Sequence, residues 1–208
     1  MSEDNIKFEK LYDEFIDFLH IKEEIKNENI NKAMLKYKEL FIKIANGIIN
    51  TYYDFSKVFT ISSSFKNCDF ITTVIIPNNI TTIPENLFEN CSNLKNVKIP
   101  DSVVIIGNNA FRECIDLEYL KLPCSLEEIG KFAFFNCVNL KNIEIPNKIK
   151  KISQWAFTGC KNLESINIPD SIKKIEETTF FGCNKLSNNL KQELIRRFGR
   201  DIFHCDML

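Results

Sequence analysis

Apolar and polar positions follow one pattern, repeated every 23 residues, through the middle of the chain. Counted from each of the first five of six evenly spaced cysteines, apolar residues recur 3, 6, 8, 12 and 15 positions later, and a proline follows at position 9. Positions 6 and 8 alternate as in a strand with one buried face, and proline ends the strand. A fixed period without insertions is typical of a stacked-coil solenoid. The six cysteines are Cys68, Cys91, Cys114, Cys137, Cys160 and Cys183, and a phenylalanine precedes each by three residues.

Amphipathic segments flank the repeats. Residues 5–25 and 30–49 each gather apolar side chains on one helical face, which predicts an antiparallel helical pair. This pair is either a cap on the first coil or a separate partner-binding module. After the last cysteine the repeat fails, and residues 187–198 predict a capping helix that ends at Gly199.

The sequence therefore predicts an α+β fold, a right-handed solenoid of 23-residue coils. We expect a helical hairpin or amino-terminal cap over residues 1–57, repeats over 58–186, and a capping helix and tail over 187–208.

The repeat reads P-x-x-[IVL]-x-x-I-x-x-x-A-F-x-x-C-x-x-L-x-x-[VIL]-x-[IL]-P, and seven of its positions agree in five or more copies. It resembles the BspA-like (treponemal-type) leucine-rich repeat, in particular its protist branch. The resemblance implies a right-handed leucine-rich-repeat solenoid with a protein-binding role, and in oral bacteria and anaerobic protists adhesion or surface-antigen roles. It names no ligand.

Composition narrows the chemistry. A formal net charge of −1 gives no field that attracts nucleic acid, so we expect no nucleic-acid partner. The first residues lack the apolar stretch of a signal peptide, and no apolar run is long enough to span a membrane, so we expect a cytoplasmic protein. Eight cysteines in that setting predict free thiols. The ladder lacks the paired spacing of zinc sites, so it predicts core packing, with no metal and no cofactor.

Catalytic constellations are missing from the sequence. Its two histidines, His20 and His204, lie far apart in the chain, and no glycine-rich phosphate loop occurs. We therefore expect a non-catalytic protein that binds protein partners and is not an enzyme. The sequence does not indicate an oligomeric state.

Two surfaces are candidate protein-binding sites. The first is the strand face that is concave in leucine-rich-repeat solenoids, at the outward positions 5 and 7 after the cysteine; tyrosine is favoured at interface centres. The second is an aromatic patch where neighbouring coils carry polar residues, and monomers seldom leave such area exposed. A solvated sheet face and side chains folded over the coil edge are the respective alternatives. The concave-face candidates are Asn96, Lys98, Tyr119, Lys121, Asn142, Glu144 and Asn167, and the aromatic candidates are Phe132, Phe135 and Trp155.

The last four residues, Cys205-Asp206-Met207-Leu208, have the C-a-a-X form that directs prenylation, although Asp206 fits its first aliphatic position poorly. If Cys205 is lipidated, the protein would attach to the plasma membrane from the cytosolic side; the alternative is an unmodified tail. Three functions stay open: an interaction module at a membrane, a cytosolic or nuclear scaffold that binds a signalling enzyme such as a protein phosphatase, and a surface adhesin.

Overall fold

The computed structural model describes residues 52–54, 65–69, 71–76 and 78–204, all within one compact unit that spans Ile42–Leu208. The expected amino-terminal helical pair lies outside the described residues.

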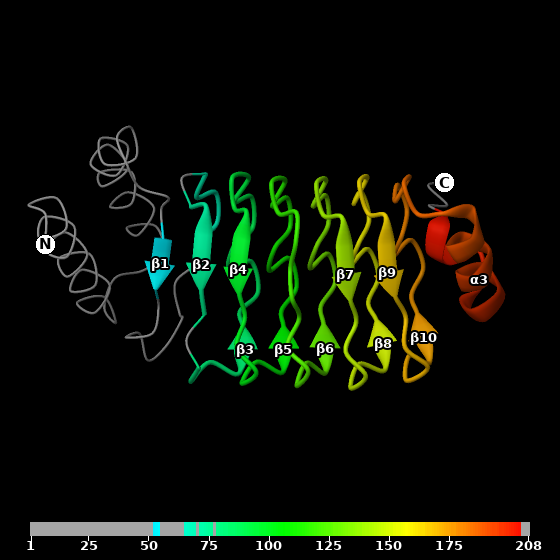
Figure 1. The fold of residues 1–208 in the computed structure, drawn as a ribbon, viewed down its shortest axis with the longest axis horizontal. Coiled ribbons are helices and arrows are strands. Elements are labelled where there is room, and N and C mark those ends of the chain that lie inside the picture. Colours follow the sequence, from blue (N-terminus) through cyan, green and yellow to red (C-terminus); the bar gives the residue numbers. More distant parts are fainter. Residues whose placement is uncertain (1–51, 55–64, 70, 77, 205–208) are drawn as a thin grey trace, which may run out of the picture. The chain divides into compact units, whose positions relative to one another are not determined.

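Short strands from successive coils form two rows, which Figure 1 shows running along the solenoid. All pairs of neighbouring strands are parallel, and β2 meets β4 with Val74 opposite Val97, one repeat later. The first row contains β1 (Tyr52–Asp54), β2 (Thr73–Ile75), β4 (Asn96–Lys98), β7 (Asn142–Glu144) and β9 (Ser165–Asn167). The second row contains β3 (Thr82–Ile83), β5 (Ile105–Ile106), β6 (Glu128–Ile129), β8 (Lys151–Ile152) and β10 (Lys174–Ile175).

The repeat pattern places the core between the two rows. In β4, Val97 is buried and its two neighbours are exposed, and β7 and β9 show the same alternation. The repeated phenylalanines form a column of stacked rings from Phe65 to Phe180, with centroids 5.3–5.9 Å apart. Each of these rings is almost fully buried, which stabilises the fold by about 1.5–3 kcal/mol per ring. Because like residues stack on like residues, the 23-residue solenoid of the prediction is confirmed.

The cysteine column combines packing with hydrogen bonding. From Cys91 onward, each thiol donates to the carbonyl of the phenylalanine 26 residues earlier, at 3.1–3.2 Å between sulfur and oxygen. Burial raises the pKa of the Cys91 and Cys183 thiols to about 12. It also raises the pKa of the three thiols between them. These thiols therefore stay protonated, which the donor role requires.

The carboxyl-terminal cap confirms the predicted helix and adds a feature. Helix α3 (Asn188–Phe198) starts at the Ser187 N-cap, whose side chain accepts from the Leu190 N–H at 3.3 Å, and stops at Gly199 with φ 92°. Its Leu194 is buried, whereas Leu190 and Phe198 are half-buried.

Beyond α3, the 3-10 helix η2 (Asp201–Phe203) returns to the register of the repeat. The Thr178 and Phe180 amides donate to the Asp201 and Ile202 carbonyls at 2.7 and 2.8 Å. Phe203 lies next in the ring column, 5.8 Å from Phe180. The sequence prediction missed this partial coil, although Phe203 stands 23 residues after Phe180.

Because the column thiols are buried, we expect the free energy of unfolding to fall steeply at alkaline pH. In the unfolded chain they ionise near pH 8.5, whereas burial keeps them protonated in the folded protein. The folded state then binds more protons, so their stabilising contribution is complete below the unfolded pKa and is lost as pH rises towards the folded one. Each thiol should cost roughly 1 kcal/mol of stability per pH unit in that range.

Urea unfolding followed by circular dichroism from about pH 8 to 11 measures this loss. Cys137→Ser provides the control, because the serine hydroxyl does not titrate in this pH range and can still donate a hydrogen bond to the Phe111 carbonyl. With five of the six column thiols hydrogen-bonded to a phenylalanine carbonyl, the variant should lose about one fifth of their pH dependence. An unchanged slope would show that Cys137 ionises alike in both states.

Candidate protein-binding surfaces

From the coil of Cys91 onward, each coil passes through left-handed backbone at two positions, one and five residues before the cysteine. At the first position the residue is asparagine, glycine or, once, Glu113. At the second, Asn86 and Asn109 have φ of 59° and 53°, as suits asparagine, which tolerates this region better than bulky residues do. Phe132 and Trp155 occupy the same position in the next two coils, with φ of 57° and 58°, and Thr178 occupies it in the coil after them, with φ of 58°. A bulky aromatic residue there is unusual and strains the backbone by roughly 1–2 kcal/mol.

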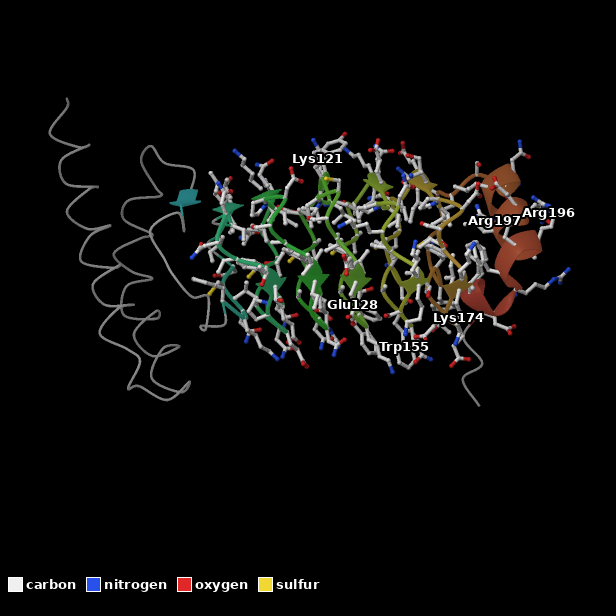
Figure 2. All side chains as sticks on the ribbon, turned by 90° about the horizontal axis from the view of Figure 1, so that it is seen from below. Lys121, Glu128, Trp155, Lys174, Arg196 and Arg197 are labelled. Carbon is white, nitrogen blue, oxygen red and sulfur yellow. The ribbon has the colours of Figure 1, made fainter. Side chains whose placement is uncertain are left out.

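These two strained residues form the centre of the predicted aromatic patch. Their rings are stacked at 4.6 Å between centroids and 19° between planes, and both side chains are half-buried. Phe135 meets Phe132 edge-on at 5.6 Å. The structure therefore brings the three predicted patch residues together, outside the stacked ring column. Figure 2 shows Trp155 at the lower edge of the solenoid and Lys121 at the upper edge.

Sequence reasoning left Arg112 out of the patch. The Arg112 guanidinium carbon lies 4.9 Å from the Phe135 ring centre and 5.8 Å from that of Phe132. The Arg112 side chain also pairs with Glu113 at 3.4 Å. Phe181 is 46% exposed, a large apolar area for one side chain. The signal was in the repeat, since Arg112, Phe135 and Phe181 share the position two residues before the cysteine.

On the outer face of the first row, all seven predicted residues are exposed. Tyr119 lies among these residues and is 58% exposed. The Lys141 ammonium lies 5.3 Å from the centre of the tyrosine ring. A hydrogen bond from Lys141 to Glu118 raises the pKa of the lysine. Asn167 serves the fold as well, because its side-chain oxygen accepts from the Ile145 N–H at 2.6 Å. Tyr119 reaches β7 only through an isolated bridge to Asn142, so this row is interrupted beneath its most exposed aromatic side chain.

No group of three or more histidine, cysteine or acidic side chains is arranged for a metal ion within the described residues. A depression of about 350 Å³ lies where the second row meets the carboxyl-terminal cap, and its lining includes Lys174, Glu176 and Asp201. Glu176 accepts from the Gln154 N–H at 2.9 Å and pairs with Lys151 and Lys174, so its carboxylate is committed to the fold.

Comparison with known proteins identifies the repeat. The model of the family described as "BspA type Leucine rich repeat region" matches residues 59–187 in six copies. The chain belongs to the BspA-type leucine-rich-repeat family. The resemblance inferred from the cysteine and phenylalanine spacing is thus confirmed. A comparison with curated proteins gave no match.

Two solved structures resemble this BspA-type protein. A leucine-rich repeat protein from Treponema pallidum is 23% identical over 70% of this chain and 81% of its own, with a TM-score of 0.53, and shows the fold alone. One from Eubacterium ventriosum is 30% identical over 56% of this chain, also with a TM-score of 0.53, and this chain spans 32% of its length. Both organisms are bacteria, so the protist branch stays a prediction.

A search of the described residues for a helix long and apolar enough to cross a bilayer found none.

The left-handed positions lead to a stability prediction for the BspA-type repeats. Replacing Phe132 and Trp155 together by asparagine should change the free energy of unfolding by less than about 1 kcal/mol per site, because relief of backbone strain offsets the lost stacking. Phe134→Ala, in the buried ring column, should cost about 3–5 kcal/mol. Urea unfolding compares the three proteins. A loss from the double variant as large as that from Phe134→Ala would mean that the patch is part of the core.

Proposed function

We propose that the protein is a non-catalytic protein-interaction module that holds its partner at the aromatic patch formed by Arg112, Phe132, Phe135 and Trp155. One observation carries the proposal: two half-buried aromatic side chains, stacked on each other, occupy left-handed backbone where the two preceding coils use asparagine and the next coil uses threonine. Strain that persists beside an exposed apolar surface is a mark of functional sites. Solenoid repeats generally act as extended binding surfaces, which agrees with this role.

The patch favours a partner that presents apolar side chains together with a carboxylate. Phenylalanine and tryptophan rings bury large areas at interfaces with little loss of conformational freedom, and such residues dominate binding energies. Arg112 lies at one end of the patch, where its guanidinium can pair with an acidic group while it stacks on Phe135. A cytosolic or nuclear scaffold that binds a signalling enzyme such as a protein phosphatase is one setting for this interaction. A surface adhesin is another setting.

The face around Tyr119 is the second candidate surface. An exposed tyrosine with Lys98, Lys121 and Lys141 nearby suits an acidic partner, and its broken strand row gives this position more freedom than the regular ladder.

Affinity capture with three baits tests the two surfaces. The bait with Phe132→Asn and Trp155→Asn should lose the main partner at least about tenfold, which is the effect of removing about 1.4 kcal/mol of binding energy. The Tyr119→Ala bait should retain the partner, and quantitative mass spectrometry measures both. Equal recovery by the wild type and the asparagine bait contradicts the proposal. Loss on the Tyr119→Ala bait alone assigns binding to the first row.

Membrane attachment through Cys205 is a separate part of the proposal. Arg196 and Arg200 are exposed just before the tail and could meet anionic headgroups. Ile202 is buried and Phe203 continues the ring column, so these two residues would have to leave the last coil if a prenyltransferase needs the segment just before Cys205 extended.

This requirement yields a kinetic prediction. Purified protein incubated with a type I geranylgeranyltransferase and labelled geranylgeranyl diphosphate should incorporate the lipid at Cys205. Ile202→Ala should react several-fold faster because the tail then dissociates more readily, and Cys205→Ser is the blank. Incorporation into neither the wild type nor Ile202→Ala would remove the lipid from the proposal without affecting the aromatic patch.

A further inference from the structure

The outer side of the second row carries a charge pattern that changes sign once along the solenoid. Each coil presents two successive outward residues there, and we call these pairs the outer strip. Figure 2 shows Glu128 and Lys174 of this strip on the same side of the molecule as Trp155. In chain order the strip is Thr81-Thr82, Val104-Ile105, Glu127-Glu128, Lys150-Lys151 and Lys173-Lys174.

Within one molecule these charges are poorly balanced. Lys151 of β8 lies directly opposite Lys174 of β10, and like charges facing each other across a strand pair destabilise it. Glu176 alone pairs with these two lysines, at 3.5 and 3.7 Å. Lys150 and Glu128 are exposed and make no ion pair within 4.0 Å among the described residues. Glu127 pairs with Lys148 at 3.6 Å between two exposed side chains, so the charges of the strip are only partly neutralised within the chain.

The order of the charges makes the strip complementary to itself. Consider a two-fold axis that lies in the plane of the contact, at right angles to the length of the strip. It crosses the strip between the coils of Glu128 and Lys151. The rotation places Glu127 and Glu128 opposite the two lysines, Lys150 and Lys151, of a second copy, and the reverse pairs form at the same time. Such an arrangement is isologous, the usual form of a protein dimer. We propose that two copies of this chain associate antiparallel through the outer strip.

The same rotation accounts for the only apolar pair in the strip. Val104 and Ile105 are half-buried, and the axis sets them opposite Lys173 and Lys174 of the second copy. The methylene groups of lysine can cover apolar side chains while the ammonium group stays in water.

Charge along the whole solenoid follows the same order as in the strip, with an acidic part before a basic part. Residues 65–147 contain seven Lys and Arg against ten Asp and Glu, whereas residues 148–204 contain eleven against six. An antiparallel pair sets the acidic part of one copy beside the basic part of the other, which speeds association and fixes orientation. The inference rests on charge and does not depend on the aromatic patch.

Sedimentation velocity of the full chain at increasing protein concentration tests the dimer. We expect a monomer–dimer equilibrium whose dissociation constant rises at least about tenfold between about 0.05 and 0.5 M salt, since exposed charge pairs are screened. Glu127→Lys with Glu128→Lys should abolish the dimer, and so should Lys150→Glu with Lys151→Glu. Circular dichroism checks that both variants remain folded.

Two restorations make the test specific. Mixing the two variants should produce a heterodimer, and one chain with all four reversals should dimerise like the wild type, because opposite charges face each other again in both cases. Lys121→Glu with Glu144→Lys, on the first row, is the matched control and should leave the dimer unchanged. A wild type that stays monomeric, or a fourfold variant that fails to dimerise while folded, would overturn the inference.

Discussion

The stack depends on two contacts between successive coils, each of which recurs at a constant sequence separation. The buried thiol from Cys91 onward donates to a phenylalanine carbonyl 26 residues earlier, and the phenylalanine ring lies on its counterpart at 5.3–5.9 Å. Both contacts require the same residue at the same place in successive coils. A thiol suits this place because it fills a small apolar space and still supplies a donor. Inward positions are therefore nearly uniform, and variation is confined to residues that point outward.

Coil geometry imposes a second constraint through the left-handed backbone. Asparagine or glycine meets it with little strain, and Asn86 and Asn109 show what the coil accepts when nothing else is required. Phe132 and Trp155 depart from this preference in adjacent coils, and their rings stack on each other. The patch is therefore a local exception on a regular frame, and its removal should leave the frame intact.

The repeating features and the segment with clear helix-end signals were accessible from the sequence, whereas details that depend on single contacts were not. The spacing of Cys91 and Phe88 predicted the coil, the buried columns and the strand rows, and the helix after Ser187 followed from its cap and Gly199. The thiol hydrogen bonds could not be inferred, because a column of cysteines also suits packing alone. Spacing identified the patch as aromatic, but the backbone strain and the position of Arg112 required coordinates.

A repeat protein supplies its own reference for each position, which sharpens functional inference from a single chain. Whatever the stack needs appears in every coil, so a residue that differs from its counterparts one repeat away reflects another requirement. By this standard Trp155 differs in shape and the outer strip differs in charge, whereas the glutamate–lysine pairs elsewhere on the surface fit ordinary solvation. Since each coil contacts chiefly its neighbours, changes on these outward surfaces need not disturb one another. Two separate surfaces can therefore act on one short solenoid, one for a partner protein and one for a second copy of the chain.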